Sequence, residues 1–167
     1  MDFLSEYNIN LHKEHLNKLK NLYSVMEKSY PEIKGQSIEK IRRMRISTSE
    51  KAEIMRLSGL ILAHEVFFSS FDSSYKSSQL VRQSFGSEAN FLYEAYVLGK
   101  EKVGFLFVFE ENGKISLSVV GDFSCGLTKT PLLAIDLEEH AYFYDYGFCK
   151  EDYLRSALKK LNLSVLD

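Results

Sequence analysis

The chain has four histidines, and three of them fall in patterns that predict buried positions. His15 lies within the apolar periodicity of one predicted helix, and His64 lies within that of another. A buried imidazole must satisfy two ring nitrogens, because a buried polar group without a partner costs about 1–3 kcal/mol. Each ring therefore either makes a hydrogen bond in the core, which is the commoner case for a single histidine, or binds a metal ion.

A carboxylate accompanies the third histidine. The segment PLLAIDLEEHAYFYDY places Asp136 at the end of a predicted strand and His140 four residues later. If a helix or turn begins at Asp136, this spacing puts both side chains on one side. Alone the two residues could form a hydrogen-bonded pair, but with His15 and His64 they complete a set of three imidazoles and one carboxylate. Such a set, without a thiolate, suits iron or manganese and does not exclude zinc.

His12 is an alternative ligand on the first helix, one turn before His15. Its neighbours Lys13 and Glu14 are charged, which favours a surface position for this part of the helix. The residue types alone leave both histidines open as ligands.

Two helices must carry the first two histidines. Residues 5–28 have one helical face at spacings of three and four, formed by Leu11, His15, Leu19, Leu22 and Met26. Ser47, Thr48 and Ser49, followed by Glu50, provide the N-cap of the second helix. Its apolar stripe contains Leu57, Leu60, Ile61, His64, Phe67, Phe68 and Phe71.

The second half of the chain predicts a small sheet with helices around it. Residues 103–110 and 114–120 are rich in Val, Phe and Ile, and Asn112-Gly113 between them is a strong hairpin signal. Residues 131–135 suit a buried third strand that ends at Asp136. Short helices are expected from 87 to 98 and from 152 onward.

Composition narrows the class of protein. The 167 residues are 45% hydrophobic and 26% charged, which is typical of a globular domain. The formal net charge of −2 gives no electrostatic reason to expect nucleic acid or an anionic membrane as a partner. No apolar run approaches the ~18 residues of a membrane span, and the first residues show no secretory h-region, so a cytoplasmic location is expected. Cys125 and Cys149 are expected to be free thiols.

The C-terminal segment resembles a family signature. PLLAIDLEEHAYFYDYGFCKEDYL is similar to the motif of the iron/manganese superoxide dismutases, in which D-x-W-E-H-A-Y-Y precedes D-Y-L. The matching residues are Asp136, Glu139, His140, Ala141, Tyr142, Asp152, Tyr153 and Leu154. Earlier segments follow in order: His15, Lys18 and Tyr23; His64, Phe67 and Phe68; Phe85-Gly86-Ser87; and a strand with Phe105 and Phe107.

The resemblance implies an α+β fold, with a helical hairpin (residues 1–75) packed on a C-terminal α/β domain (residues 76–167) that holds a small three-stranded antiparallel sheet. It implies one iron or manganese ion per subunit, bound between the two parts. By this match His15, rather than His12, joins His64, Asp136 and His140 as a ligand.

The resemblance also implies a function, dismutation of superoxide, and a homodimer. Tyr23 takes the gateway position near the metal. Glu139 is matched to the glutamate that reaches a ligand histidine of the partner subunit. The surroundings of the metal and the dimer contact are then formed by Glu139, Tyr142, Phe105, Phe107 and Phe68.

This chain departs from the family pattern around the metal. The family places a glutamine against the metal-bound solvent, but the matching positions hold Leu60 and Asp122 or Phe123. The absence of this glutamine leaves open a second function, that of a catalytically weak metal-binding relative. A third candidate is an iron oxidase or oxygenase with an organic substrate.

Three further positions differ from the family. A glutamate, Glu138, replaces an expected tryptophan, and a rearranged surface position is the favoured explanation over an added acidic ligand acting with Glu65. Leu19 and Phe143 jointly replace a histidine and a tyrosine that touch across the family's dimer. Their joint change looks compensatory, because losing only one would strand a buried polar partner.

Overall fold

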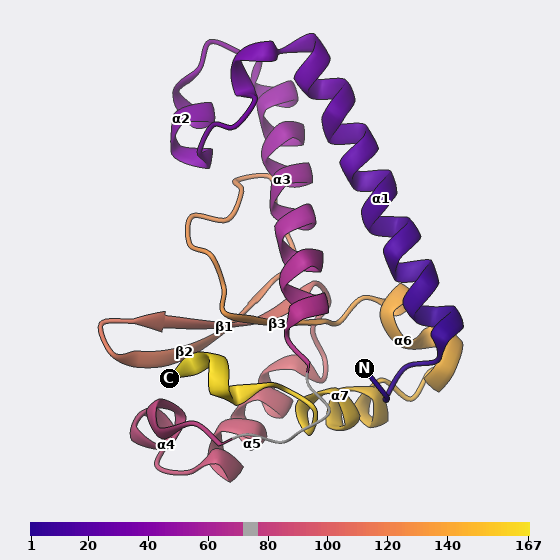
Figure 1. The fold of residues 1–167 in the computed structure, drawn as a ribbon, viewed down its shortest axis with the longest axis vertical. Coiled ribbons are helices and arrows are strands. Elements are labelled where there is room, and N and C mark those ends of the chain that lie inside the picture. The colour runs from indigo at the N-terminus through magenta and orange to yellow at the C-terminus, as the bar shows by residue number, and fades with distance from the viewer. Residues whose placement is uncertain (72–76) are drawn as a thin grey trace.

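The computed structural model describes residues 1–71 and 77–167 (Figure 1). Along the chain the elements are α1 (Glu6–Ser29), η1 (Pro31–Ile33), α2 (Ile38–Arg43), α3 (Thr48–Ser69), α4 (Gln79–Phe85), α5 (Glu88–Gly99), β1 (Phe105–Glu111), β2 (Lys114–Val120), β3 (Leu133–Asp136), α6 (Glu139–Tyr146), α7 (Lys150–Leu158) and η2 (Leu163–Leu166). The long helices α1 and α3 rise from the sheet, α2 lies at their far end, and α4, α5 and α7 lie on the other side of the sheet (Figure 1).

Serine caps begin both long helices. The Ser5 hydroxyl accepts from the Asn8 backbone N–H at the start of α1, and the Ser47 hydroxyl accepts from Glu50 N–H at the start of α3. The two helices pack against each other. Away from the sheet they meet α2 around a separate small core, formed by Ile33, Ile41, Ile54 and Met55.

The sheet is antiparallel with the order β2-β1-β3. Asn112 and Gly113 both have positive φ and form the β1–β2 turn, as the type I′ signal predicts. β3 is buried along its whole length, and its pairing with β1 sets Asp136 opposite Phe105. The end of β3 is therefore held at the middle of the main core.

The predicted fold class is confirmed: a helical N-terminal region and a C-terminal part with a three-stranded antiparallel sheet. The helix α4 was not predicted, and β1 begins two residues later than expected. The predicted boundary between residues 75 and 76 lies outside the described residues and stays a prediction.

The buried face of α1 differs from the predicted one. Its buried residues are Asn8, His12, Leu16 and Leu19, whereas Leu11 and Leu22 are exposed. Successive residues lie 100° apart on a helix, so the observed stripe is rotated by about 60° from the predicted one. This rotation changes which histidine faces the core.

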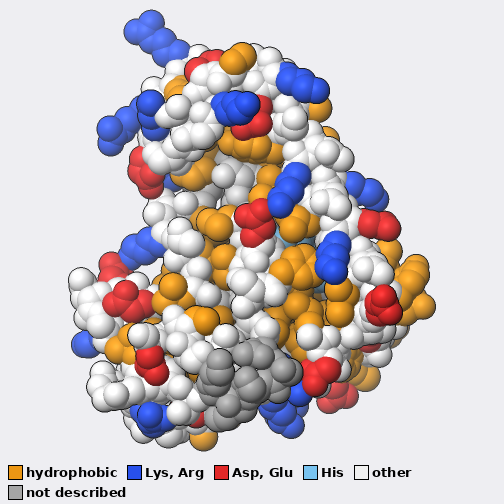
Figure 2. Space-filling view, viewed as in Figure 1, with side chains coloured by type: hydrophobic (Ala, Val, Ile, Leu, Met, Phe, Trp, Pro, Cys, Tyr) orange, Lys and Arg blue, Asp and Glu red, His pale blue; other side chains and the backbone are white. Residues whose placement is uncertain are grey.

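The surface carries charges of both signs. On the face shown in Figure 2, acidic and basic side chains are interspersed around hydrophobic groups that gather in the middle of the view, in keeping with a net charge of −2. None of the described helices has the length and apolar character needed to cross a membrane.

Candidate metal centre

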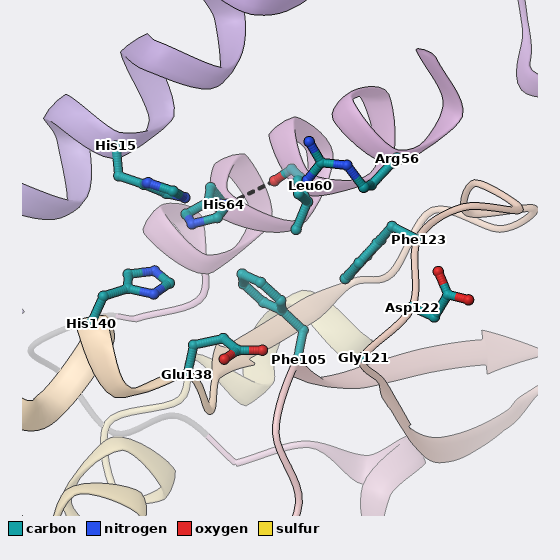
Figure 3. Close-up of a pocket in the computed structure, with 10 residues that line it drawn as sticks. All are labelled: His15, Arg56, Leu60, His64, Phe105, Gly121, Asp122, Phe123, Glu138 and His140. Carbon is teal, nitrogen blue, oxygen red and sulfur yellow. Dashed lines mark hydrogen bonds between the residues drawn. The ribbon is translucent and has the colours of Figure 1, made fainter. Parts of the chain in front are cut away.

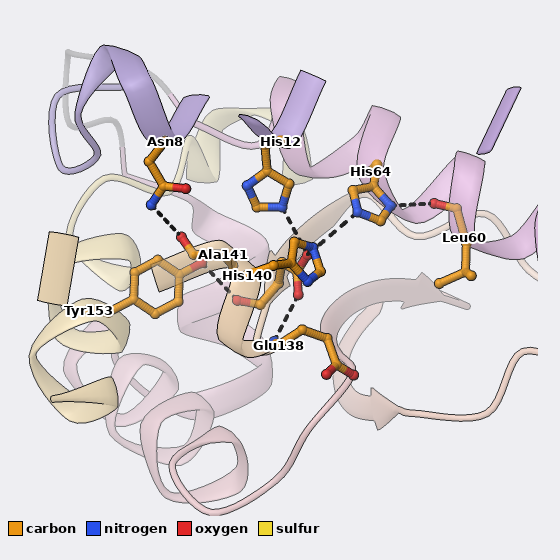
Figure 4. Close-up of polar contacts among 9 residues, drawn as sticks. Asn8, His12, Leu60, His64, Glu138, His140, Ala141 and Tyr153 are labelled. Atoms are coloured by element: carbon orange, nitrogen blue, oxygen red, sulfur yellow. Dashed lines mark hydrogen bonds and ion pairs between the residues drawn. The ribbon is translucent and has the colours of Figure 1, made fainter. Parts of the chain in front are cut away.

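Three imidazoles converge on one carboxylate oxygen. Asp136 Oδ2 lies 3.0 Å from His12 Nε2, 3.1 Å from His140 Nε2 and 3.6 Å from His64 Nε2. One donor atom from each of the four residues lies within 4.8 Å of all the others. Figure 4 shows the three rings approaching from different elements, namely α1, α3 and α6. Three segments far apart in sequence, namely α1, α3 and the stretch from β3 into α6, thus form one cluster.

The carboxylate of Asp136 is fixed from both sides. Its second oxygen, Oδ1, accepts a hydrogen bond from the Glu138 backbone N–H at 2.9 Å. The buried Tyr153 hydroxyl donates to the Asp136 carbonyl at 2.7 Å, and this ring stacks on Tyr142. Because the strand end is held in this way, Oδ2 stays directed at the imidazoles.

A backbone hydrogen bond orients His64. Its Nδ1 lies 2.7 Å from the Leu60 carbonyl, one turn earlier on α3, and as a carbonyl only accepts, Nδ1 must carry the proton. The neutral ring then presents the lone pair of Nε2 to the cluster. This Nε2 is buried and has no hydrogen-bond partner, which leaves it ready to bind a cation.

Packing and a polar anchor place His12. Its ring is buried and stacks on Phe67, with centroids 4.8 Å apart. One turn earlier, the buried Asn8 donates to the Ala141 carbonyl at 3.0 Å and to the Asp145 carboxylate at 3.1 Å. Since i and i+4 lie on one face of a helix, docking Asn8 onto α6 also turns His12 toward Asp136.

The charges in the cluster support one another. Burial alone would raise the pKa of the Asp136 carboxyl, but hydrogen bonds with His12 and His140 outweigh it, and the pKa lies well below its usual range. Burial also opposes the charged form of His140, yet the bond to Asp136 raises its pKa. For His64 burial dominates and lowers the pKa to about 4. At neutral pH the site thus keeps a carboxylate and at least one neutral imidazole directed at it.

The donors fit a single metal ion. Two donors at about 2.1 Å from one ion lie about 3.0 Å apart at right angles and about 3.6 Å apart at 120°. The observed separations of 3.0, 3.1 and 3.6 Å match these values. Imidazole and carboxylate donors without thiolate suit iron or manganese. The unpartnered Nε2 of His64 would gain in the ion the partner that it lacks.

The prediction that His12 lies at the surface is wrong. His12 is 1% exposed and belongs to the donor cluster, and His15 does not. His15 lies beside it, with its ring centroid 5.0 Å from that of His64 and 4.8 Å from that of His140. The rotated buried face of α1 explains why His12, and not His15, belongs to the donor cluster. The spacing of Asn8, His12, Leu16 and Leu19 was the signal that could have found it.

Tyr23 does not lie at the cluster, contrary to prediction. It packs against the small core near α2 that contains Ile33 and Ile54. Eleven residues separate it from His12, which corresponds to about 16 Å along a helix. Burial, followed by the nearby Glu27, raises the pKa of its hydroxyl.

Most other predicted neighbours do surround the site. Phe105 contacts His64, with ring centroids 5.0 Å apart, and Phe107 stacks on Phe105. Phe68 meets His12 edge-on. Tyr142 is buried further from the donors, where its ring stacks on Tyr153. Glu139 is exposed, so its expected contact with a partner subunit stays a prediction.

A cavity of about 260 Å³ opens beside the donors. The positions expected for a glutamine, Leu60, Asp122 and Phe123, all line it, and none carries an amide. Glu138 also lines the cavity and is partly buried, and the surface position favoured for it stays a prediction. Glu65 instead pairs with Lys20 at 2.7 Å, and neither glutamate belongs to the donor cluster.

The metal-free protein is expected to lose stability as the pH falls from 7.5 to 5. The pKa of His64 is about 4 when folded and about 6.5 when unfolded, so the unfolded state binds more protons in this range. The loss due to His64 amounts to about 2 kcal/mol. His140 acts in the opposite sense, because its pKa is raised.

Urea unfolding of the wild type and of His64→Gln at both pH values isolates the contribution of His64. The variant should show a smaller loss of stability on acidification, by about 2 kcal/mol. An equal loss in both proteins would contradict a depressed pKa at His64.

Comparisons with known proteins agree with this geometry. The family model described as "Iron/manganese superoxide dismutases, C-terminal domain" matches residues 72–167, which include Asp136 and His140. A curated protein, "Superoxide dismutase [Fe]" from Synechococcus elongatus, is 24% identical over 140 residues, which covers 78% of this chain and 70% of that protein.

Proposed function

This chain belongs to the iron/manganese superoxide dismutase family, and we propose that it disproportionates superoxide at a single iron or manganese ion. One superoxide loses an electron and becomes oxygen. A second gains that electron and, with two protons, becomes hydrogen peroxide. His12, His64, Asp136 and His140 are the proposed ligands.

The observation that carries this proposal is the convergence of four donor atoms within 4.8 Å of one another, three of them from buried residues and the fourth from the more exposed His140. A bound ion would supply one-electron exchange between its +3 and +2 states. The negatively charged Asp136 carboxylate would lie beside the ion. The Leu60 carbonyl keeps His64 in the tautomer that binds through Nε2. Phe105 and Phe67 pack around the rings and exclude water from their far sides.

The cavity has room for a small substrate. At about 260 Å³ it falls below the ~300–1,000 Å³ of pockets that enclose drug-sized ligands. A diatomic anion fits such a space, which is compatible with dismutation.

The test is superoxide removal by protein loaded with iron or with manganese, with metal content measured on the same preparation. The rate should scale with bound metal, and His64→Ala should abolish removal. Protein stripped with a chelator is the control for trace metal. A fully occupied site that removes no superoxide would overturn the proposed activity.

A specific observation favours a second function, a metal-binding relative with weak turnover. The three positions where the family's glutamine is expected, Leu60, Asp122 and Phe123, reach the cavity without supplying an amide. Such a protein would bind stoichiometric iron or manganese and show negligible turnover. The same experiment separates the two functions.

We also propose a homodimer formed through an exposed, mostly aromatic patch on α1, α6 and the loop after α6, which consists of Tyr7, Leu11, Phe143, Tyr144 and Phe148. Their exposed fractions run from 40% for Leu11 to 89% for Phe148. The Tyr7 ring contacts that of Tyr144, with centroids 4.3 Å apart, and Phe143 contacts Phe148. Exposed apolar groups of this size mark interaction surfaces. The exposed Glu139 lies beside Phe143 on the same helix.

Phe148→Glu is expected to convert the dimer to a monomer, because it places a charge within the aromatic patch. Sedimentation velocity at micromolar concentration measures the change. The matched control is Tyr93→Glu on α5, which replaces a ring exposed by 68% outside the patch and should leave the dimer intact. Equal behaviour of the two variants would argue against this interface.

The cytoplasmic location is likewise proposed. Cys125 and Cys149 are both exposed and unpaired, which suits a reducing compartment.

A further inference from the structure

The cavity beside the donors is where a small anion would meet the metal centre. Its walls include His64 and His140 from the donor cluster, and His15 from α1. Figure 3 shows His15 and His140 approaching His64 from two sides of this space. An anion held here needs a hydrogen-bond donor from the wall, since the aromatic walls offer none.

The other polar side chains in the wall are at least partly taken up by other partners. Arg56 forms a two-pronged pair with Glu53, with both N–O distances at 2.7 Å, through two of its five N–H donors. The carboxylate of Asp122 accepts from the backbone N–H and the hydroxyl of Ser124, at 2.8 and 3.0 Å. Glu138 is a third polar group, but an ionised carboxylate only accepts hydrogen bonds and repels an anion.

His15 is a donor in this wall that also contacts the donor cluster. Its ring is partly buried and contacts the rings of His64 and His140, with centroids 5.0 and 4.8 Å away. No hydrogen bond within the described residues occupies either of its nitrogens. A histidine ring carries at least one N–H in either protonation state, so His15 can offer one to a ligand.

We propose that His15 is a positioning residue that donates a hydrogen bond to a small monoanion bound in this cavity. The inference rests on the proposed function, because it presumes that a metal ion at the donor cluster attracts such an anion. In this role His15 supplies the cavity with a hydrogen-bond donor from α1. The side chains of Leu60 and Phe123, which also line the cavity, supply none. His15 makes and breaks no covalent bond in this role, and it is not a metal ligand.

Azide is a suitable probe, since it is a small monoanion that binds ferric iron and is not turned over as superoxide is. Azide is titrated into iron-loaded wild type, His15→Leu and His15→Gln while the visible absorption of the iron is followed. His15→Leu should bind azide about tenfold more weakly, as expected for the loss of one hydrogen bond to a charged group. His15→Gln, whose amide can donate, should stay within about threefold of the wild type.

Tyr23→Phe is the matched control, because it alters a polar aromatic group on the same helix away from the cavity. It should leave azide affinity unchanged. Iron content and circular dichroism of each variant establish that the site and fold are retained.

The possible outcomes are distinct. If His15→Leu binds azide within twofold of the wild type, or if it loses its iron, the role given to His15 is overturned. If the wild type itself holds no stoichiometric iron or manganese, the proposed function fails before His15 is tested.

Discussion

His12→Gln is expected to lower the affinity for iron or manganese by at least about a hundredfold. Loss of a residue that only supports a ligand already costs about 10–100-fold, and His12 is placed here as a ligand itself. Its Nε2 lies 3.0 Å from Asp136 Oδ2 within the donor cluster. Metal content after dialysis against a fixed concentration of free metal measures the effect.

His15→Gln is the matched control, on the same helix and with the same substitution. It should retain metal affinity within about threefold, because His15 lies outside the four-donor group. The reverse result, with metal lost from His15→Gln and kept by His12→Gln, would restore the ligand set that the family resemblance implied.

Gly104→Ala is expected to destabilise the protein by about 4 kcal/mol or to prevent folding. A Cβ at this position would lie 2.2 Å from the Val120 carbonyl oxygen and 2.6 Å from the Gly121 Cα, and both belong to the backbone. The φ of +101° is also unfavourable for any residue with a side chain. Relief of the clash would require β1 and the end of β2 to move apart.

The same change should weaken metal binding. The Gly104 carbonyl accepts from the Leu137 N–H at 2.7 Å, directly after Asp136, so a displaced Gly104 shifts the strand end that carries the carboxylate. Urea unfolding and metal content are measured together.

Gly113→Ala is the comparison for Gly104→Ala. Its φ is +74°, but a Cβ there meets nothing within 4 Å, so only the backbone strain of about 1–2 kcal/mol remains. Similar losses of stability in both variants would show that the close approach to Val120 is not the cause.

Local sequence determined the secondary structure around the site. Asn112-Gly113 specifies a tight turn whatever the rest of the chain does, because both residues tolerate positive φ. Serine caps at Ser5 and Ser47 fix where the long helices begin. The spacing of Asp136 and His140 was also sufficient, since four residues across a strand end and the first turn of α6 bring the two side chains to 3.1 Å.

The face that α1 buries was not determined by local sequence. Apolar residues occur on two neighbouring arcs of this helix, one with Leu11 and Leu22 and one with Leu16, and helical periodicity suits either. The choice depends on Asn8, whose side-chain NH₂ group donates to the Ala141 carbonyl and to Asp145 on a helix more than 130 residues away. A single sequence does not contain that contact.

The sequence by itself thus determined the fold class, the family and three of the four residues in the donor cluster. Tertiary structure decided that His12 completes the cluster, that Tyr23 lies in another core, and that Glu138 and His15 line a cavity. The physical reason is that residue types and spacings fix local geometry, whereas the rotation of one packed helix against another is set by contacts between distant segments.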